Sequence, residues 1–184
     1  MEFVALLRGI NVGGNNLIKM SELKRCFDKL GFGNVRTFIA SGNVLFEHAE
    51  AVGPKLTARI EATLEKTFDY RASIVLRSAK ELRAIVTGAP QGFGREPAKF
   101  RYDVIFLKQP LTASVAMKSV RTKDGVDQAF AGKGVLYFSR LIAKATQSQM
   151  GKIVGLPVYK SMTIRNWNTT TKLLALMQSS NEQR

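Results

Sequence analysis

The stretch Val35-Arg36-Thr37-Phe38-Ile39-Ala40-Ser41-Gly42-Asn43-Val44-Leu45-Phe46 decides the fold. Its two arms, 35–40 and 43–46, are rich in apolar and β-branched residues, and the dipeptide Ser41-Gly42 between them is typical of a tight turn. The pattern predicts a β-hairpin. The elements on either side of a hairpin decide which kind of sheet it joins, and here a helical pattern lies on both sides.

Apolar residues recur at spacings near three and four over residues 20–30 and again from Pro54 onward, which predicts two amphipathic helices. Ser21 is expected to cap the first helix, and Pro54 suits the first turn of the second. Apolar strands are expected at 3–7, before the first helix, and at 73–76, after the second. The resulting order, β-α-β-β-α-β, is the ferredoxin-like path.

The same order of elements recurs in the second half of the chain. Ser78 and Glu81 have the spacing of a capping box, so an extra helix is expected between the two copies. Strands are expected at 102–107, 126–130, 135–138 and 162–165, and helices from Pro110, over 147–154 and over 169–177. We therefore predict an α+β fold of two tandem ferredoxin-like halves, each followed by an extra helix. The first half spans 1–88, a glycine- and proline-rich linker spans 89–100, and the second half spans 101–184.

Composition excludes several classes of protein. The chain of 184 residues has one cysteine, Cys26, and one histidine, His48, so neither a disulfide framework nor the usual metal sites and histidine triads are expected. We predict no metal and no cofactor. No apolar run approaches the length of a membrane helix, and the N-terminal apolar stretch is too short for a signal peptide. The expectation is a cytoplasmic protein without membrane contact; the sequence predicts no oligomeric state.

Basic residues are concentrated in the second half of the chain. Residues 91–184 hold 15 Lys or Arg against 5 Asp or Glu, whereas residues 1–90 hold 13 against 9, and the whole chain has a formal net charge of +14. Such an asymmetry favours an anionic partner, either nucleic acid or a phosphate-bearing small molecule. Because the basic residues are scattered singly, a merely soluble, mixed surface is the alternative interpretation.

A glycine-rich loop, Arg8-Gly9-Ile10-Asn11-Val12-Gly13-Gly14-Asn15-Asn16, joins the first strand to the first helix. Glycines let backbone N–H groups converge on an anion, but Asn15-Asn16 stand where a P-loop needs Gly-Lys-Ser/Thr, which disfavours nucleoside triphosphate hydrolysis. In a ferredoxin-like unit this loop and the turn Ser41-Gly42-Asn43 lie at the same edge of the sheet. The two segments form either a polar ligand site or a set of turns that satisfy one another.

A second polar segment, Arg165-Asn166-Trp167-Asn168, lies between the last strand and the last helix. In the structural interpretation, Asn168 or Thr169 caps the helix and Trp167 fills a seam between the halves. In the functional interpretation, Trp167 stacks on a ring while Arg165 holds a phosphate or carboxylate. A weaker pattern from Lys133 to Phe138 is similar to the base-stacking strand of RNA-recognition modules, although alternation directs one of its two adjacent aromatic residues into the core.

The segments around Arg8–Gly14, Ser41–Val44 and Arg165–Thr169 contain the motifs RGINVGG, SGNV and RNWNT, and with them the chain resembles a widespread bacterial family of unknown function. The resemblance spans nearly the whole chain. It implies that the polar residues of the three segments are features that the family shares. It departs at residues 139–144, where members of the family often have a glycine- and serine-bearing stretch.

These observations lead to three hypotheses about the function. The first is a non-catalytic protein that binds an anionic partner through the glycine-rich loop and the Ser41–Asn43 turn. The second is an enzyme for a small anionic substrate, with Arg8 and Arg165 as orienting groups, although no base or nucleophile stands out. The third is a structural or interaction protein. The candidate ligand-binding residues are Arg8, Gly9, Asn11, Gly13, Gly14, Asn15, Asn16, Ser41, Gly42, Asn43, Arg165, Asn166, Trp167 and Asn168.

Overall fold

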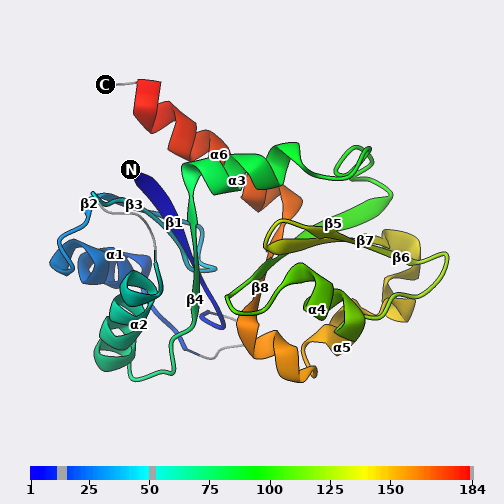
Figure 1. Cartoon of the computed structure of the whole chain (residues 1–184), viewed down its shortest axis with the longest axis horizontal. Helices are drawn as coiled ribbons and strands as arrows, with labels where there is room; N and C mark the ends of the chain where they lie inside the picture. The colour runs from blue at the N-terminus through cyan, green and yellow to red at the C-terminus, as the bar shows by residue number, and fades with distance from the viewer. Residues whose placement is uncertain (12–15, 50–52, 183–184) are drawn as a thin grey trace. The chain divides into compact units, whose positions relative to one another are not determined.

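A computed structural model describes residues 1–11, 16–49 and 53–182 of the chain (Figure 1). The fold is α+β, with two four-stranded antiparallel sheets and helices between their strands. The elements of the first part are β1 (Glu2–Leu7), α1 (Met20–Lys29), β2 (Gly33–Phe38), β3 (Asn43–Glu47), α2 (Pro54–Phe68), β4 (Ile74–Ser78) and α3 (Ala79–Thr87).

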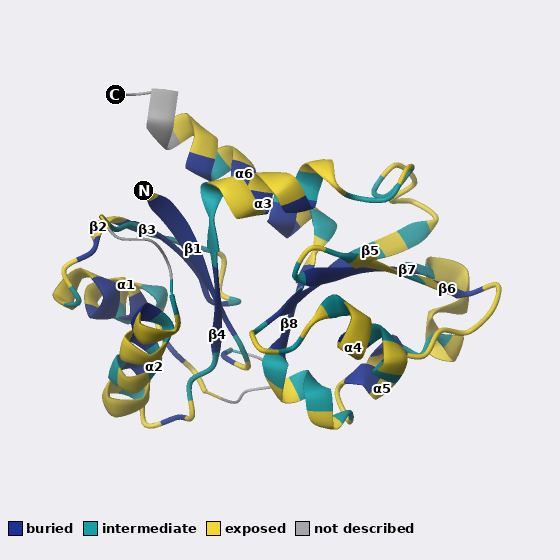
Figure 2. Ribbon diagram, viewed as in Figure 1, coloured by how far each residue is buried: buried dark blue, intermediate teal, exposed yellow. Residues whose placement is uncertain are grey.

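The first sheet has the strand order β2-β3-β1-β4, so the hairpin that follows α1 places its second strand against β1. Ala5 of β1 is opposite Val44 of β3, and Leu76 of β4 is opposite Ala5 on the other side. β1 is buried along its entire length (Figure 2). Helices α1 and α2 cover one face of the sheet, where their apolar residues join the core that contains Phe27 and Ile60.

The starts of the first helices are partly as expected. α2 begins at Pro54, and the Ser78–Glu81 capping box is confirmed, since Ser78 N donates to the Glu81 carboxylate at 2.8 Å. Ser21 does not cap α1, however. The helix begins one residue before it, at Met20, because the carbonyl of Lys19 already accepts the first helical hydrogen bonds.

The second part repeats the pattern with more irregular connections. Its elements are β5 (Phe100–Leu107), α4 (Ala113–Ser119), β6 (Asp127–Gly132), β7 (Val135–Leu141), the 3-10 helix η1 (Ile142–Gln147), α5 (Met150–Ile153), the 3-10 helix η2 (Pro157–Ser161), β8 (Met162–Asn166) and α6 (Trp167–Glu182). The strand order of this sheet is β6-β7-β5-β8, the same arrangement as in the first. The predicted hairpin across Gly132-Lys133-Gly134 is confirmed, with Gly132 opposite Val135.

Three helix starts differ from those expected. α4 does not open at Pro110; Thr112 caps it, and its hydroxyl accepts a hydrogen bond from Val115 N at 3.4 Å. The helix expected over 147–154 is shorter. η1 ends at Gln147 and α5 spans only Met150–Ile153, and Asp127 accepts hydrogen bonds from Ser148 Oγ and Gln149 N, which separate the two helices. The last helix begins at Trp167 rather than at residue 169.

Contacts divide the chain into two compact units, which we call the first unit (Met1–Leu82 with Leu173–Arg184) and the second unit (Arg83–Lys172). The boundaries inferred from the sequence, 1–88, 89–100 and 101–184, stay a prediction. The glycine- and proline-rich segment belongs to the second unit by this division. Within it, the ring of Phe93 packs edge-on against Tyr102, Tyr137 and Trp167, with ring centroids 4.9–5.4 Å apart.

Two general features bear on function. None of the helices in the described part of the chain has the length and hydropathy that crossing a bilayer requires. The described residues also contain no group of three or more His, Cys, Asp or Glu side chains placed to hold a metal ion.

Candidate functional site

The glycine-rich loop and the hairpin turn of the first unit are neighbours, as predicted. Leu7 N donates to Gly42 O at 2.8 Å, and Asn11 Nδ2 donates to Ala40 O at the same distance. Gly42 lies so close to the side chain of Ile10 that an added Cβ would be 2.7 Å from its Cδ1 atom. Three of the candidate residues in this loop, Gly13, Gly14 and Asn15, lie outside the described residues.

The carboxamides of this junction bind the protein itself. Asn11 Nδ2 also donates to Ile18 O at 3.0 Å, and Asn11 Oδ1 accepts from Ile18 N at 2.8 Å. Asn16 Nδ2 donates to Gly9 O, and the buried Asn43 donates to Phe38 O. Asn11 therefore ties the described part of the loop to the hairpin, while Asn16 bonds within the loop and Asn43 within the hairpin. This use of the carboxamides favours the turn-satisfying interpretation of the motif.

We expect Asn11→Ala to lower the free energy of unfolding by about 2 kcal/mol, because three hydrogen bonds are lost and alanine is disfavoured at a left-handed position. Asn11 has φ 52°, a conformation that asparagine tolerates better than alanine does. Thermal unfolding measures the effect. Asn34→Ala is the matched control, since Asn34 has φ 46° and a single side-chain hydrogen bond at an exposed position. Equal losses in the two variants would show that the bonds of Asn11 add nothing.

The described site residues outside this junction are distributed between the two units. In the first unit, Arg8 is half-buried, and its backbone N–H donates to Ser73 O at 2.9 Å. In the second unit, Arg165 is buried in β8, and burial lowers the pKa of its guanidinium to about 10. Its Nη1 donates to Ile164 O at 2.9 Å. Its neighbours Asn166, Trp167 and Asn168 lie at a pocket, which Arg165 does not line.

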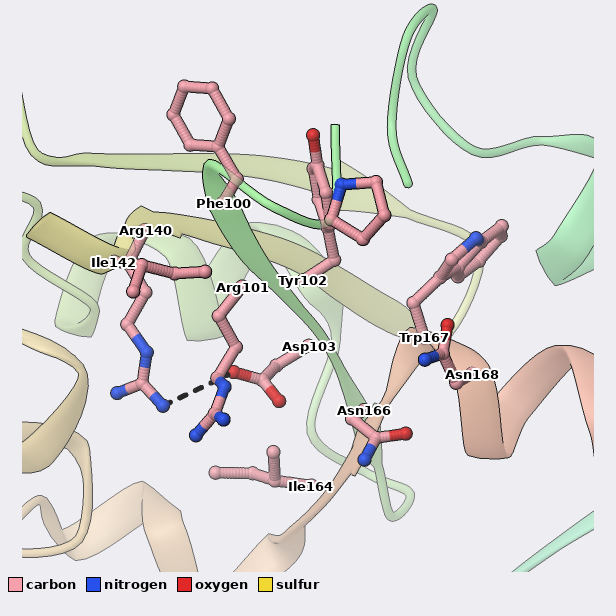
Figure 3. Close-up of a pocket in the computed structure, with 11 residues that line it drawn as sticks. Phe100, Arg101, Tyr102, Asp103, Arg140, Ile142, Ile164, Asn166, Trp167 and Asn168 are labelled. Carbon is pink, nitrogen blue, oxygen red and sulfur yellow. Dashed lines mark ion pairs between the residues drawn. The ribbon is translucent and has the colours of Figure 1, made fainter. Parts of the chain in front are cut away.

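This pocket of the second unit is a cavity of about 430 Å³ at one end of the second sheet (Figure 3). Its apolar lining residues are Pro97, Phe100, Tyr102, Ile142, Ile164 and Trp167. Its polar lining residues are Arg101, Asp103, Arg140, Asn166 and Asn168. The volume is in the range typical of small-molecule sites.

The pocket has two arginines and one carboxylate. Arg101 of β5 is opposite Arg140 of β7 in the strand register. Arg140 Nη2 lies 3.8 Å from Asp103 Oδ2, an ion pair too long for a hydrogen bond. In the described part of the chain, neither guanidinium donates a hydrogen bond to a protein acceptor. Both arginines are thus available to an anion that enters the pocket.

Asp103 is a buried carboxylate with an altered titration. Asp103 is 7% exposed, and its Oδ2 atom is buried with no hydrogen-bond partner among the described residues. Burial raises the pKa of Asp103, and the charges of Arg140 and Arg101 offset only part of this effect. A raised carboxyl pKa in a pocket is typical of functional sites, although ion-pair networks also produce it.

We expect Asp103→Asn to raise the melting temperature at neutral pH, with the gain disappearing at low pH. Burial raises the pKa of Asp103 in the folded protein, so the protonated carboxyl stabilises the fold below the ordinary aspartate pKa. This stabilisation is lost as the pH rises through the raised pKa and the carboxyl ionises. Asparagine does not titrate. Melting temperatures between about pH 3.5 and pH 7.5 measure the difference. The exposed Asp124→Asn is the control, and a gain independent of pH in Asp103→Asn would contradict the assignment.

The start of α6 forms the side of the pocket that is lined by Asn166, Trp167 and Asn168. Asn166, rather than Asn168 or Thr169, caps the helix, because its Oδ1 accepts a hydrogen bond from Thr169 N at 2.7 Å. The Trp167 ring packs edge-on against Phe93, with centroids 5.2 Å apart, and Gly94 lies against its Nε1 atom. Asn168 is exposed, and its carboxamide has no hydrogen bond within the described part of the chain.

Of the pocket residues, Asn166, Trp167 and Asn168 are predicted from the sequence, whereas Arg101, Asp103 and Arg140 are not. Arg101 and Asp103 were overlooked, although they occupy the same alternating face of β5 as the core residues Ile105 and Leu107. Charged residues at core-facing positions of a strand are the signal that finds such a site. The weak resemblance of β7 to a base-stacking strand has no support in burial, since Tyr137 and Phe138 are both buried and Tyr137 donates to Ile85 O at 2.6 Å.

A family model described as a protein of unknown function (DUF1697) matches residues 1–137. The chain belongs to this family. Among solved structures, a conserved bacterial protein from Streptococcus pneumoniae is similar to the chain, with 26% sequence identity and a TM-score of 0.82. The likeness covers 96% of this chain and 98% of that one. A search of curated proteins finds no match.

Membership of the DUF1697 family confirms the family of unknown function that the sequence resemblance indicated. The matched region contains the glycine-rich loop, the hairpin turn and the pocket residues Arg101 and Asp103. It ends before Arg140 and before the segment at 165–168. That the motifs RGINVGG, SGNV and RNWNT are the signature of the family stays a prediction.

Proposed function

We propose that this DUF1697 protein is a cytoplasmic, non-catalytic binding protein for an anionic ligand, and that the ligand binds in the pocket of the second unit. The observation that carries the proposal is the pair of guanidinium groups, Arg101 and Arg140, on adjacent strands with Asp103 as the only carboxylate that lines the pocket in the described part of the chain. Two guanidinium groups suit a phosphate or carboxylate, which each can bind through two parallel hydrogen bonds. The excess of basic residues in 91–184 supports the same conclusion.

We further infer that each unit is ferredoxin-like. The orders β2-β3-β1-β4 and β6-β7-β5-β8, with all described pairings antiparallel, support this inference. On that path, Arg101 and Arg140 come from the two central strands of the second sheet. Neighbouring central strands position side chains more rigidly than loops do.

The glycine-rich loop is a second candidate for the anion site. Its support is the packing of Leu7 and Ile10 against Gly42 of the Ser41-Gly42-Asn43 turn, next to the exposed Gly9. Against it, the carboxamides of Asn11 and Asn43 already bind backbone carbonyls. That use favours the structural hypothesis for this junction, so we assign ligand binding to the second unit.

The enzyme hypothesis has one specific observation in its favour, which is Asp103. A buried carboxylate with a raised pKa, beside two arginines, is suited to transfer a proton to or from an anionic substrate. In this alternative Arg101 and Arg140 orient the substrate, in place of the Arg8 and Arg165 inferred from the sequence. Turnover of a bound ligand, abolished in Asp103→Asn, would distinguish the enzyme from the binding protein.

The proposal is tested by calorimetric titration with inorganic pyrophosphate and with single-stranded RNA and DNA at two salt concentrations. The double variant Arg101→Gln/Arg140→Gln should bind roughly 10- to 100-fold more weakly, because charge-assisted hydrogen bonds are lost. The matched control is Arg121→Gln/Lys123→Gln, which removes the same charge from exposed residues that do not line the pocket. An equal loss of affinity in the control variant would show that the effect comes from overall charge and not from the pocket. No binding of any probe at low salt would refute the proposal.

A further inference from the structure

The lining of the second-unit pocket indicates more about its ligand than negative charge. Neither oxygen of the Asp103 carboxylate accepts a hydrogen bond in the described part of the chain, and the side chain is 9% exposed. A buried acceptor without a donor is destabilising, so such groups are normally satisfied. A ligand that enters this pocket can supply the donor through a hydroxyl or an N–H group. The ligand that fits is therefore both an anion and a hydrogen-bond donor.

One wall of the pocket is aromatic. Phe100, Tyr102 and Trp167 line it, and the Trp167 indole is held in place by Phe93 and by the close approach of Gly94. A fixed aromatic side chain is a stacking platform for a planar ring and is tolerant of the identity of that ring. An aliphatic anion would leave this wall unused.

Two carboxamides beside the indole add polar groups for the edge of a ring. Asn168 has both its N–H donors and its carbonyl acceptor unused within the described residues. Asn166 Oδ1 accepts a hydrogen bond from Thr169 N, and its two side-chain N–H donors have no partner among the described residues. A carboxamide with donor and acceptor side by side is the group that pairs with the edges of nucleobases.

Arg101 and Asp103 alternate with Phe100 and Tyr102 along β5, and β8 pairs with β5 only as far as Asp103, so the pocket passes round the uncovered end of β5 from the arginines on one face to the aromatic side chains on the other. A nucleotide laid along this path has its groups in the matching order. Figure 3 shows the guanidinium groups of Arg101 and Arg140 on one side of Asp103, and Trp167 with Asn168 on the other. In a nucleotide the sugar hydroxyls lie between the phosphate and the base. We propose, building on the function proposed above, that the pocket binds a nucleoside monophosphate, either free or as one unit of a single strand. Its phosphate contacts the arginines, a sugar hydroxyl contacts Asp103, and its base lies against Trp167.

Trp167 is the only tryptophan of the chain, so its fluorescence reports directly on the pocket. The probes are AMP, GMP, ribose 5-phosphate, inorganic pyrophosphate and a ten-nucleotide oligoadenylate, each also titrated by calorimetry. We expect AMP or GMP to quench Trp167 and to bind at least tenfold more tightly than ribose 5-phosphate. Asn168→Ala should weaken that nucleotide about tenfold and leave ribose 5-phosphate unchanged. Gln128→Ala, an exposed amide on β6 outside the pocket, is the matched control.

The outcomes separate the two proposals. Equal affinity for nucleotides and ribose 5-phosphate, with pyrophosphate bound, would overturn the nucleotide inference and leave the anion-binding function intact. Binding of none of the probes would overturn both. Oligoadenylate bound 100-fold more tightly than AMP would identify a nucleic-acid strand as the source of the nucleotide, and equal affinities would identify the free nucleotide; both results support the inference.

Discussion

Gly42→Ala is expected to lower the free energy of unfolding by about 3 kcal/mol, through two separate costs. Gly42 has φ 74°, a left-handed conformation in which an L side chain is strained. Its added Cβ would also lie 2.7 Å from Ile10 Cδ1 and 2.8 Å from Leu7 Cβ. Both neighbours are buried in the first core, so neither can move aside without disturbing it. Thermal and urea unfolding measure the loss.

Gly9→Ala separates the two costs of the Gly42 variant. Gly9 belongs to the loop that packs on this turn and has φ 70°, but an added Cβ would meet no atom within 4 Å. We therefore expect only the conformational cost, about 1 kcal/mol. If the two variants lost the same stability, the close packing of Ile10 on the turn would carry no energy. The junction would then be held by its hydrogen bonds alone.

The elements of the fold could be predicted from the sequence because each depends on a local pattern. The hairpin around Ser41-Gly42 and the capping box of Ser78 and Glu81 are signals a few residues long. The adjacency of loop and turn followed from the order of elements alone, and the Asn11–Ala40 hydrogen bond confirms it. The starts of α1, α4 and α6 differ by one to three residues from those expected, because neighbouring polar groups compete to cap each helix. The helix expected over 147–154 is shortened by a non-local partner, Asp127 of β6, which no local pattern predicts.

The pocket could be predicted only in part, for a related reason. Its segment at 166–168 is contiguous and contains unusual residues, so the sequence draws attention to it. Arg101 and Arg140 come together only through the register of β5 and β7, which no local pattern encodes. Conversely, the glycine-rich loop is a candidate ligand site in the sequence, because polar turn residues have the same composition whether they bind a ligand or one another. Only the hydrogen-bond partners of the carboxamides distinguish the two.

Gly94→Ala is expected to have the largest effect on the pocket itself. Gly94 has φ 85°, and its added Cβ would collide with Nε1 of Trp167 and lie 2.5 Å from Cδ1. The indole cannot stay where Phe93 now holds it, so the aromatic wall of the pocket moves. We expect a red-shifted Trp167 emission, a loss of about 3 kcal/mol in unfolding free energy, and nucleotide binding weakened at least tenfold.

Gly92→Ala is the control that makes this result specific. It lies two residues earlier in the same segment and has φ 81°, yet its added Cβ would meet no atom within 4 Å. It should lose about 1 kcal/mol and leave both the emission and the binding unchanged. If Gly94→Ala shifted the emission without weakening nucleotide binding, Trp167 would be a structural residue only. If both glycine variants weakened binding equally, the whole segment from Gly92 to Gly94, rather than the indole, would shape the pocket.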